Sequence, residues 1–145
     1  MYSLAYAIVQ NESDAGEVIS ESIYRAYKNL NTLKSENSFK PWILQIIHNT
    51  AVELIRKNTK IIPAEYINDT VGYDNSSDIT TKLTLQNAVK NLKQPYRTVV
   101  VLFYYEDLPI SKIAQITNTN IVTIRKQLSR ARNMLREILK EDFDT

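Results

Sequence analysis

Basic side chains are concentrated near the C-terminal end of the chain. Residues 121–140 contain six lysines or arginines and a single acid, Glu137. The whole chain has a formal net charge of only +2, so the remainder is net acidic. Clustered cations of this kind bind a polyanion such as a nucleic acid, or they form a solvated helix face. The six are Arg125, Lys126, Arg130, Arg132, Arg136 and Lys140.

The sequence offers little for catalysis or metal binding. It has no cysteine, which removes disulfides, thiolate nucleophiles and cysteine-based zinc sites, and this is compatible with a reducing cytoplasm. The single histidine, His48, has no paired ligand, so we expect no metal site. The acids Glu12, Asp14, Glu17 and Glu21 are spread along one segment without an evident pair for acid–base work. We therefore expect a protein without catalytic residues, cofactor or small-molecule substrate.

The composition favours an all-α fold. Only two of the 145 residues are glycine, which disfavours turn-rich β folds and nucleotide-cradling loops. Runs of Leu, Ile, Ala, Glu, Lys and Arg favour helices. No apolar run approaches the ~20 residues of a membrane span. The first residues also lack the basic patch and apolar core of a signal peptide.

The first part of the chain shows three segments with helical periodicity, at about residues 2–10, 14–30 and 41–57. The polar cluster at 11–14 predicts the start of the second helix. Trp42 is expected in the core, whereas the sequence leaves Phe39 open between core and surface. In the second segment, residues at three- and four-residue steps predict one buried face. These residues are Ala15, Val18, Ile19, Ser22, Ile23, Ala26, Tyr27 and Leu30.

The periodicity stops over residues 58–80, where Pro63, Gly72 and many small polar residues predict a flexible interdomain linker. Four further helices are then expected. They cover about residues 82–92, a segment that starts at Pro95, a short segment after Leu108-Pro109 and residues 121–140. The last helix carries an apolar stripe of Ile121, Ile124, Leu128, Ala131, Leu135 and Ile138.

The last two helices are joined by a polar turn at residues 117–120, which is typical of a helix-turn-helix. A helical hairpin in any α bundle would show the same periodicity. If the apolar stripe packs on the short helix, the opposite face is free to enter the major groove of DNA. Arg132 and Arg136, further along, are expected to pair with phosphates or acidic neighbours. The free face carries Val122, Thr123, Lys126, Ser129 and Arg130, with Arg125 on its flank.

The order of residues in these segments resembles a known family. Residues 91–139 read NLKQPYRTVVVLFYYEDLPISKIAQITNTNIVTIRKQLSRARNMLREIL and strongly resemble region 4 of the extracytoplasmic-function (ECF) sigma factors of bacterial RNA polymerase. Residues 14–30 (DAGEVISESIYRAYKNL) and 38–57 (SFKPWILQIIHNTAVELIRK) resemble region 2. The two matches stand in the family order with a variable segment between them.

The resemblance implies two small helical domains, with region 2 over residues 1–57, a linker over 58–80 and region 4 over 81–145. Region 2 starts later than is usual in the family. The resemblance also implies a non-enzymatic cytoplasmic subunit whose partners are core RNA polymerase, promoter DNA and an anti-sigma factor. It is expected to recognise the −10 and −35 promoter elements and to help open the −10 element.

Carried over residue by residue, the resemblance assigns three binding sets. The polymerase-binding set is Asp14, Glu17, Glu21 and Arg25, all expected to be exposed. The −10 set, which would surround a base flipped from the non-template strand, is Leu33, Lys34, Ser38, Phe39 and Asn49. The −35 set is Thr123, Arg125, Lys126, Ser129 and Arg130.

Two other interpretations remain open at this stage. The chain could be a helix-turn-helix regulator that binds operator DNA as a dimer and needs no polymerase. It could also be a sigma-like accessory subunit that binds polymerase but opens promoters only with a partner. Activity with core polymerase would separate both from a sigma factor.

Overall fold

The computed structural model describes residues 1–61 and 81–143, and every regular element in these two ranges is helical. We call residues 1–61 the N-terminal half and residues 81–143 the C-terminal half. Short helical turns η1, η2 and η4 cover Leu30–Thr32, Glu36–Ser38 and Val101–Tyr105. The helices are α1 (Tyr2–Val9), α2 (Glu12–Lys28), α3 (Phe39–Ile61), α4 (Thr81–Lys90), α5 (Tyr96–Val100), α6 (Ile110–Thr117) and α7 (Ile121–Phe143).

A sharp two-residue corner joins α1 to α2. Gln10 closes α1 in a left-handed conformation with φ of 53°, and its N–H donates to the carbonyl of Tyr6 at 2.8 Å. Asn11 then caps α2, because its side-chain oxygen accepts the N–H of Asp14 at 3.0 Å. The predicted helix start in this polar cluster is confirmed.

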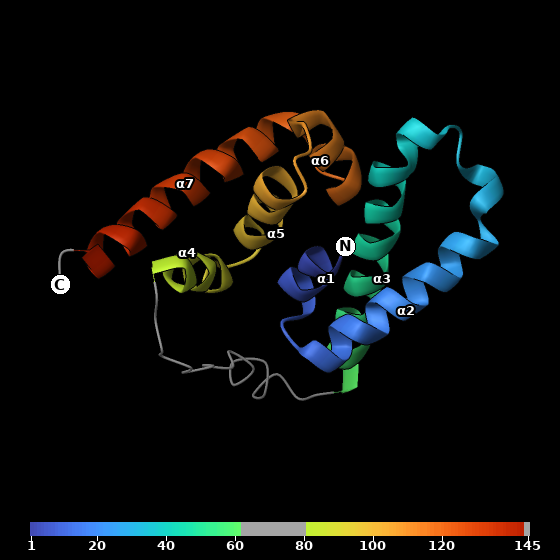
Figure 1. Cartoon of the computed structure of the whole chain (residues 1–145), viewed down its shortest axis with the longest axis horizontal. Helices are drawn as coiled ribbons and strands as arrows, with labels where there is room; N and C mark the ends of the chain where they lie inside the picture. Colours follow the sequence, from blue (N-terminus) through green and yellow to red (C-terminus); the bar gives the residue numbers. More distant parts are fainter. Residues whose placement is uncertain (62–80, 144–145) are drawn as a thin grey trace.

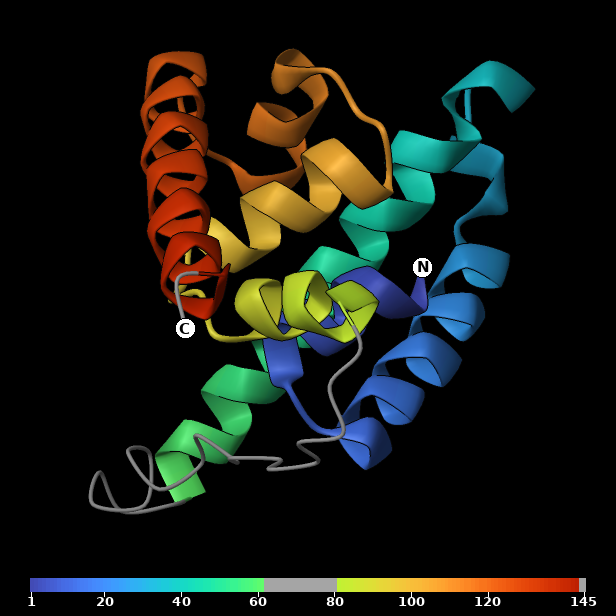
Figure 2. The same ribbon diagram turned by 60° about the vertical axis from the view of Figure 1, so that its left-hand side comes forward.

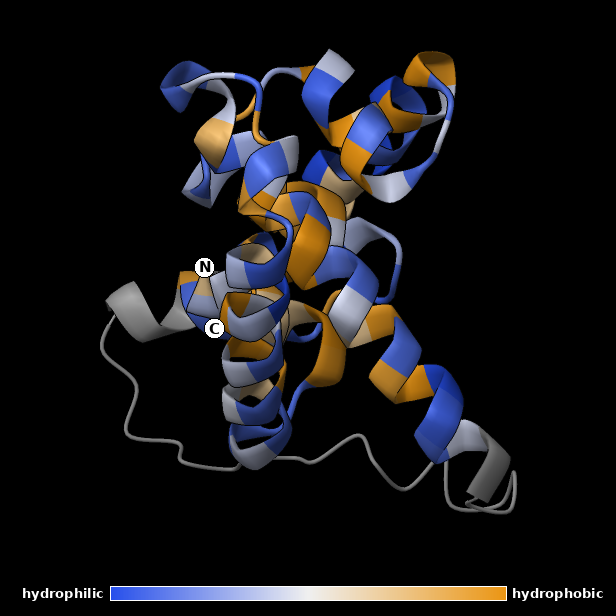
Figure 3. Ribbon diagram, turned by 90° about the vertical axis from the view of Figure 1, so that its right-hand side faces the viewer, coloured by the Kyte–Doolittle hydropathy of each residue, from blue (hydrophilic) through white to orange (hydrophobic). Residues whose placement is uncertain are grey.

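Helix α1 lies at the centre of the molecule, between the other helices of the two halves (Figures 1 and 2). It packs against α2 and α3 on one side and against α5 and η4 on the other. A second contact joins the halves where α3 packs against α6. Buried apolar residues of both halves therefore belong to one cluster, which Figure 3 shows as apolar positions turned inward between the helices.

The buried face of α2 differs from the prediction. Ala15, Val18 and Ser22 are buried, but Ile23, Tyr27 and Leu30 are exposed. The reason is length: α2 has 17 residues and spans about 25 Å, whereas the eight-residue α1 spans about 12 Å. Over its last turns α2 is thus covered chiefly by α3, and its apolar side chains outside that contact remain in solvent.

Two predicted boundaries also differ. Helix α3 ends at Ile61 rather than at residue 57, since no helix-breaking residue occurs before Pro63. The first four positions of the predicted linker are thus helical, and residues 62–80 lie outside the described residues. Ile121, expected in the buried stripe of α7, is 41 % exposed because it is the first residue of the helix. The stripe begins at Ile124.

None of the helices in the two described ranges is both long enough and apolar enough to cross a lipid bilayer.

The core makes a direct stability prediction. Leu102 is fully buried, so Leu102→Ala should lower the free energy of unfolding by about 2–5 kcal/mol through lost apolar contact and a residual cavity. Leu85 is about half exposed, and Leu85→Ala should change the free energy of unfolding by no more than about 0.5 kcal/mol. Urea unfolding followed by circular dichroism measures both. Equal effects of the two variants would contradict the packing described.

Candidate nucleic-acid interface

A rigid turn connects α6 to α7. Asn118 ends α6 in the left-handed conformation, and the N–H of Thr119 donates to the carbonyl of Ala114 at 2.9 Å. The side-chain oxygen of Asn120 accepts the N–H of Val122 at 2.8 Å and so caps α7. These bonds fix the direction in which α7 leaves the turn, as a helix-turn-helix requires.

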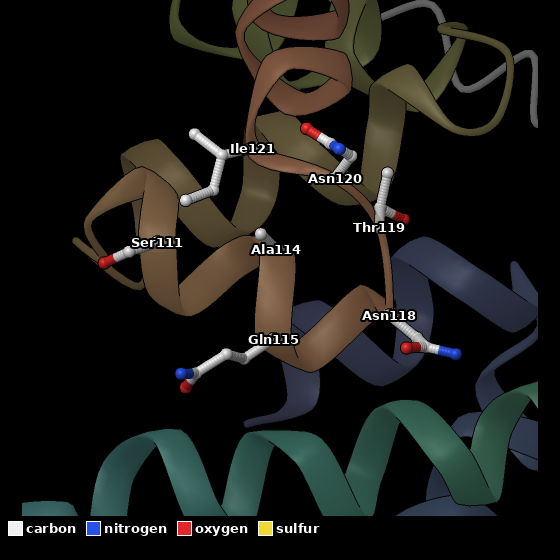
Figure 4. Close-up of a pocket in the computed structure, with 7 residues that line it drawn as sticks. All are labelled: Ser111, Ala114, Gln115, Asn118, Thr119, Asn120 and Ile121. Carbon is white, nitrogen blue, oxygen red and sulfur yellow. The ribbon is translucent and has the colours of Figure 1, made fainter.

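An open hollow lies beside this turn, between α6 and the first residues of α7 (Figure 4). Both polar and apolar residues line it, and its surface continues that of the start of α7. It is therefore part of the same face and not a separate ligand cavity. The lining residues are Ser111, Ala114, Gln115, Asn118, Thr119, Asn120 and Ile121.

The exposed face of α7 carries the whole predicted −35 set. The stripe of Ile124, Leu128 and Ala131 is buried against the other helices of the C-terminal half. This packing leaves the remaining faces of the helix in solvent. None of the ion pairs within the described residues involves the basic side chains of this set. The exposed set is Thr123, Arg125, Lys126, Ser129 and Arg130.

Arg132, two residues beyond this set, has a different role. Its Nε donates to the hydroxyl of Tyr104 at 2.6 Å. Its guanidinium lies 5.5 Å from the ring centre of Phe103 and 5.8 Å from that of Tyr104. The expected partner was a phosphate or an acid, but the side chain instead holds α7 against η4. The sequence does place an aromatic pair in η4, but no periodicity pairs it with an arginine 28 residues later.

Three residues of the predicted −10 set lie between α2 and α3, and a fourth, Phe39, is the first residue of α3. Lys34 and Phe39 are exposed, whereas Leu33 and Ser38 are half-buried. Asn49 is also exposed, but it lies ten residues after Phe39 and so about 15 Å further along α3. The structure thus brings the loop residues together and places Asn49 on the same helix at a distance.

Trp42 anchors this loop. Its indole N–H donates to the hydroxyl of Thr32 at 3.1 Å, and that hydroxyl donates to the carbonyl of Asn29 at 2.7 Å. The indole also packs against the apolar core, which confirms the prediction for Trp42. The ring of Phe39 lies 5.9 Å from the Trp42 ring, centre to centre, and is 45 % exposed. The structure therefore places Phe39 on the surface, supported from behind by Trp42.

The predicted polymerase-binding set is only partly free. Glu17 and Glu21 are exposed and Asp14 is half-buried. Arg25 is not a free cation, because it pairs with Glu21 at 3.1 Å and with Glu53 of α3 at 2.7 Å. The hydrogen bond to Glu53 is the main cause that raises the pKa of Arg25 above its usual value. The expected exposure of Arg25 is corrected: its side chain is partly buried and ties α2 to α3.

An apolar strip that the sequence analysis assigned mostly to the core lies on the same outer surface of α2. Its members are more than half exposed, with Tyr27 at 79 %. An exposed strip of this kind, next to exposed acids, is typical of a protein-binding surface. The strip consists of Ile23, Tyr24, Tyr27 and Leu30.

Comparison with known proteins agrees with this arrangement. Residues 1–61 match the family model for sigma-70 region 2, and residues 82–135 match that for sigma-70 region 4. The RNA polymerase sigma factor SigV of Bacillus subtilis is 31 % identical over 98 % of this chain and 86 % of its own length. The ECF sigma factor SigW of the same organism is 28 % identical over 97 % of this chain and 83 % of its own length.

Solved structures show the same fold. The sigma factor RpoE of Bartonella quintana, solved with the anti-sigma factor NepR, superimposes with a TM-score of 0.76 at 20 % identity. The match covers 96 % of this chain and 89 % of the other. The fold and its exposed basic helix define a two-region, helix-turn-helix DNA-binding protein. The chain belongs to the sigma-70 family of RNA polymerase sigma factors, within its ECF group.

His48 is enclosed in the N-terminal half. Its Nδ1 is buried without a hydrogen-bond partner, and burial lowers the pKa of the imidazole below 6.5, although a hydrogen bond with Asn49 opposes this effect. Across residues 1–61 and 81–143, no three side chains of His, Cys, Asp or Glu are grouped so that they could hold a metal ion. His48 therefore acts as a packed, neutral side chain next to a predicted −10 residue.

The lowered pKa of His48 makes stability depend on pH. Below about pH 6.5 the unfolded chain binds a proton that the folded chain resists, so folding stability should fall as pH decreases through that range. Urea unfolding at about pH 7.5 and pH 5.5 measures the loss. The variant His48→Gln should lose less stability between these two conditions. A loss as large in the variant as in the parent chain would show that His48 is not the cause.

Proposed function

We propose that the two halves of this sigma factor divide promoter recognition between them. The C-terminal half reads the −35 element with α7, and the N-terminal half reads and opens the −10 element with the α2–α3 loop and α3. The observation that carries the proposal is the −35 face, where exposed cations free of ion pairs stand at the start of a helix fixed by a capped turn.

At the −35 element, α7 would enter the major groove with its N-terminal end first. Arg125, Lys126 and Arg130 reach either guanine edges or phosphates. Val122 is 54 % exposed at the same end and offers an apolar contact for a thymine methyl. The contacts near the start of α7 would determine sequence preference, and those further along would add charge.

At the −10 element, the exposed ring of Phe39 would stack on a base that leaves the duplex. Flipping one base costs a few kcal/mol, and opening each base-pair step costs about 1.4 kcal/mol in lost stacking. One aromatic platform recovers about 1–3 kcal/mol. A chain of 16.7 kDa cannot supply the remainder alone, so core polymerase must contribute most contacts to an open promoter.

The outer surface of α2 would bind core polymerase. It combines the exposed acids Glu17 and Glu21, the second of which is paired with Arg25, with the exposed apolar strip, so both charge and apolar area are available for a protein partner. Of the solved structures with this fold, the sigma factor RpoE was captured with the anti-sigma factor NepR, and CnrH with the cytosolic domain of CnrY. We propose that this chain is also controlled by an anti-sigma factor. It acts in the cytoplasm and by binding alone, with no catalytic group of its own.

In vitro run-off transcription tests the function directly. Core polymerase with this chain should start transcripts at defined positions on templates that carry a cognate promoter, whereas core polymerase alone should not. The chain without polymerase should bind the same DNA weakly, because its own contacts do not cover the cost of opening. Tight, polymerase-independent binding to a palindromic site would instead support an operator-binding regulator.

The −35 assignment makes a residue-level prediction. Arg125→Ala or Lys126→Ala should weaken holoenzyme binding by about 1–3 kcal/mol if the side chain reads a base. Gel-shift titration on two templates, one with the −35 element intact and one with it scrambled, separates base reading from phosphate contact. A base-reading residue loses affinity only on the intact template. Equal losses on both templates would show that the residue contacts phosphate alone.

A further inference from the structure

The C-terminal end of α1 is capped by residues of the other half of the chain. The carbonyl of Ala7 belongs to the last turn of α1, and the helix does not continue far enough to supply its usual N–H partner. It accepts two bonds from the C-terminal half instead. Nε2 of Gln94 donates to it at 3.0 Å, and Nε of Arg97 also donates to it. A cation at a helix C-terminus is additionally favoured by the helix dipole.

Arg97 is an unusual residue for this position. It is only 8 % exposed, and it follows Pro95 at the start of an otherwise apolar helix. Its second hydrogen bond, from Nη1, goes to the carbonyl of Leu92 at 2.8 Å. No carboxylate pairs with it within the described residues. The charge is therefore compensated by neutral carbonyls, and burial lowers the pKa of Arg97 to about 10. The guanidinium stays charged at neutral pH.

Further contacts surround this cap. Nε2 of Gln10 donates to the carbonyl of Lys90 at 2.9 Å, and the ammonium of Lys90 lies 5.5 Å from the ring centre of Tyr6. The other side of Gln94 holds its own half in place, because its side-chain oxygen accepts the hydroxyl of Thr98 at 2.8 Å. Together with the α3–α6 contact, these bonds join the two halves into one closed body.

The closed body is too small for the proposed task. Promoter positions −10 and −35 are about 25 base pairs apart, which is about 85 Å along the duplex at 3.4 Å per base pair. A compact chain of 145 residues has a radius of gyration of about 15 Å and is roughly 40 Å across. The two DNA-binding sets must therefore separate before both can bind. The twenty residues that follow Ile61 up to Thr81 can reach about 70 Å when extended, which permits this separation.

We propose that Arg97 and Gln94 form an autoinhibitory latch on the C-terminal end of α1, which holds the free sigma factor closed until core polymerase separates the halves. The closed state would prevent simultaneous contact with both promoter elements, and this consequence rests on the function proposed above. The latch itself does not depend on that function.

The chemistry of Arg97 suits a reversible contact. A guanidinium that is buried against carbonyls alone has lost its hydration without gaining an ion pair. When the halves separate, water returns to the guanidinium and restores part of this hydration free energy. The carbonyls of Ala7 and Lys90 can also bind water once they are exposed. Opening thus leaves no polar group unsatisfied, and the closed state is held chiefly by apolar contact and well-aligned bonds.

A distance measurement on the full chain tests the latch without polymerase or DNA. The sequence has no cysteine, so Ser20→Cys and Asn133→Cys introduce two label sites, both exposed and one in each half. With nitroxide labels, double electron–electron resonance should give a single narrow distance for the parent chain. Arg97→Ala in this background should add a population with longer distances. Gln10→Gly removes the hydrogen bond to Lys90 in the other half, and glycine tolerates the left-handed backbone at position 10. This variant should lengthen the distance less than Arg97→Ala does.

Arg132→Ala is the matched control. It also removes an arginine with a side-chain hydrogen bond from the C-terminal half, but its partner Tyr104 lies in that same half. It should leave the distance unchanged. Circular dichroism shows whether Arg97→Ala keeps its helices. If it does not, Gln94→Ala decides the test instead, because it removes the other donor to the Ala7 carbonyl. An unchanged distance in that variant would overturn the latch.

Promoter binding supplies the second readout. If the closed form accounts for about 99 % of the free chain, complete opening should raise its apparent affinity for promoter DNA up to about 100-fold. A long, broad distance distribution in the parent chain would show that no latch exists. The same narrow distance in the parent chain and in Arg97→Ala and Gln10→Gly would also overturn the proposal. If the distances shift as expected but no transcription follows with core polymerase, the latch stands and the proposed function fails.

Discussion

Helix α1 depends entirely on the two halves that bury it. Eight residues are too few for a stable isolated helix in water, so α1 exists because its neighbours cover it. Leu4, Ala5, Ala7 and Ile8 are all buried, and they contact α2 and α3 on one side and α5 and η4 on the other. The arrangement of α2, α3, α5 and η4 in the closed molecule is therefore set by packing around a short segment that is not stable as an isolated helix.

Position along α7 determines what each basic residue can do. Arg125 and Arg132 are one residue type on one helix, seven residues and thus nearly two turns apart. Arg125 is exposed beside the buried stripe, near the capped turn, and makes no ion pair within the described residues. Arg132 lies over the aromatic side chains of η4 and is bound to Tyr104. The same charge thus serves recognition at the start of the helix and packing further along, because Arg132 meets the aromatic side chains of η4 and Arg125 does not.

Periodicity in the sequence predicted the helices and the exposed −35 set well, because both follow from which residues avoid water. It failed where the covering partner had to be known. The apolar spacing on α2 continues through Ile23, Tyr27 and Leu30, but these side chains lie outside the contact with α3 and stay exposed. The prediction that Ile121 is buried was wrong for the same reason, because the first residue of α7 is not covered by a neighbouring helix. Arg97 gives no periodic signal at all, since its partner is a carbonyl 90 residues earlier in the chain.

The contact between the halves has a strength that suits a switch. Each neutral side-chain hydrogen bond contributes about 0.5–1.5 kcal/mol net and each bond from a charged donor about 1.5–3 kcal/mol. The bonds from Gln10, Gln94 and Arg97 therefore amount to a few kcal/mol, in addition to the apolar contact between the halves. A partner that binds with nanomolar affinity supplies about 12 kcal/mol. Core polymerase can therefore separate the halves and still bind tightly, because only part of its binding free energy is used to open the chain. A covalent link would not permit this, whereas a bare flexible tether would leave the DNA-binding faces free at all times.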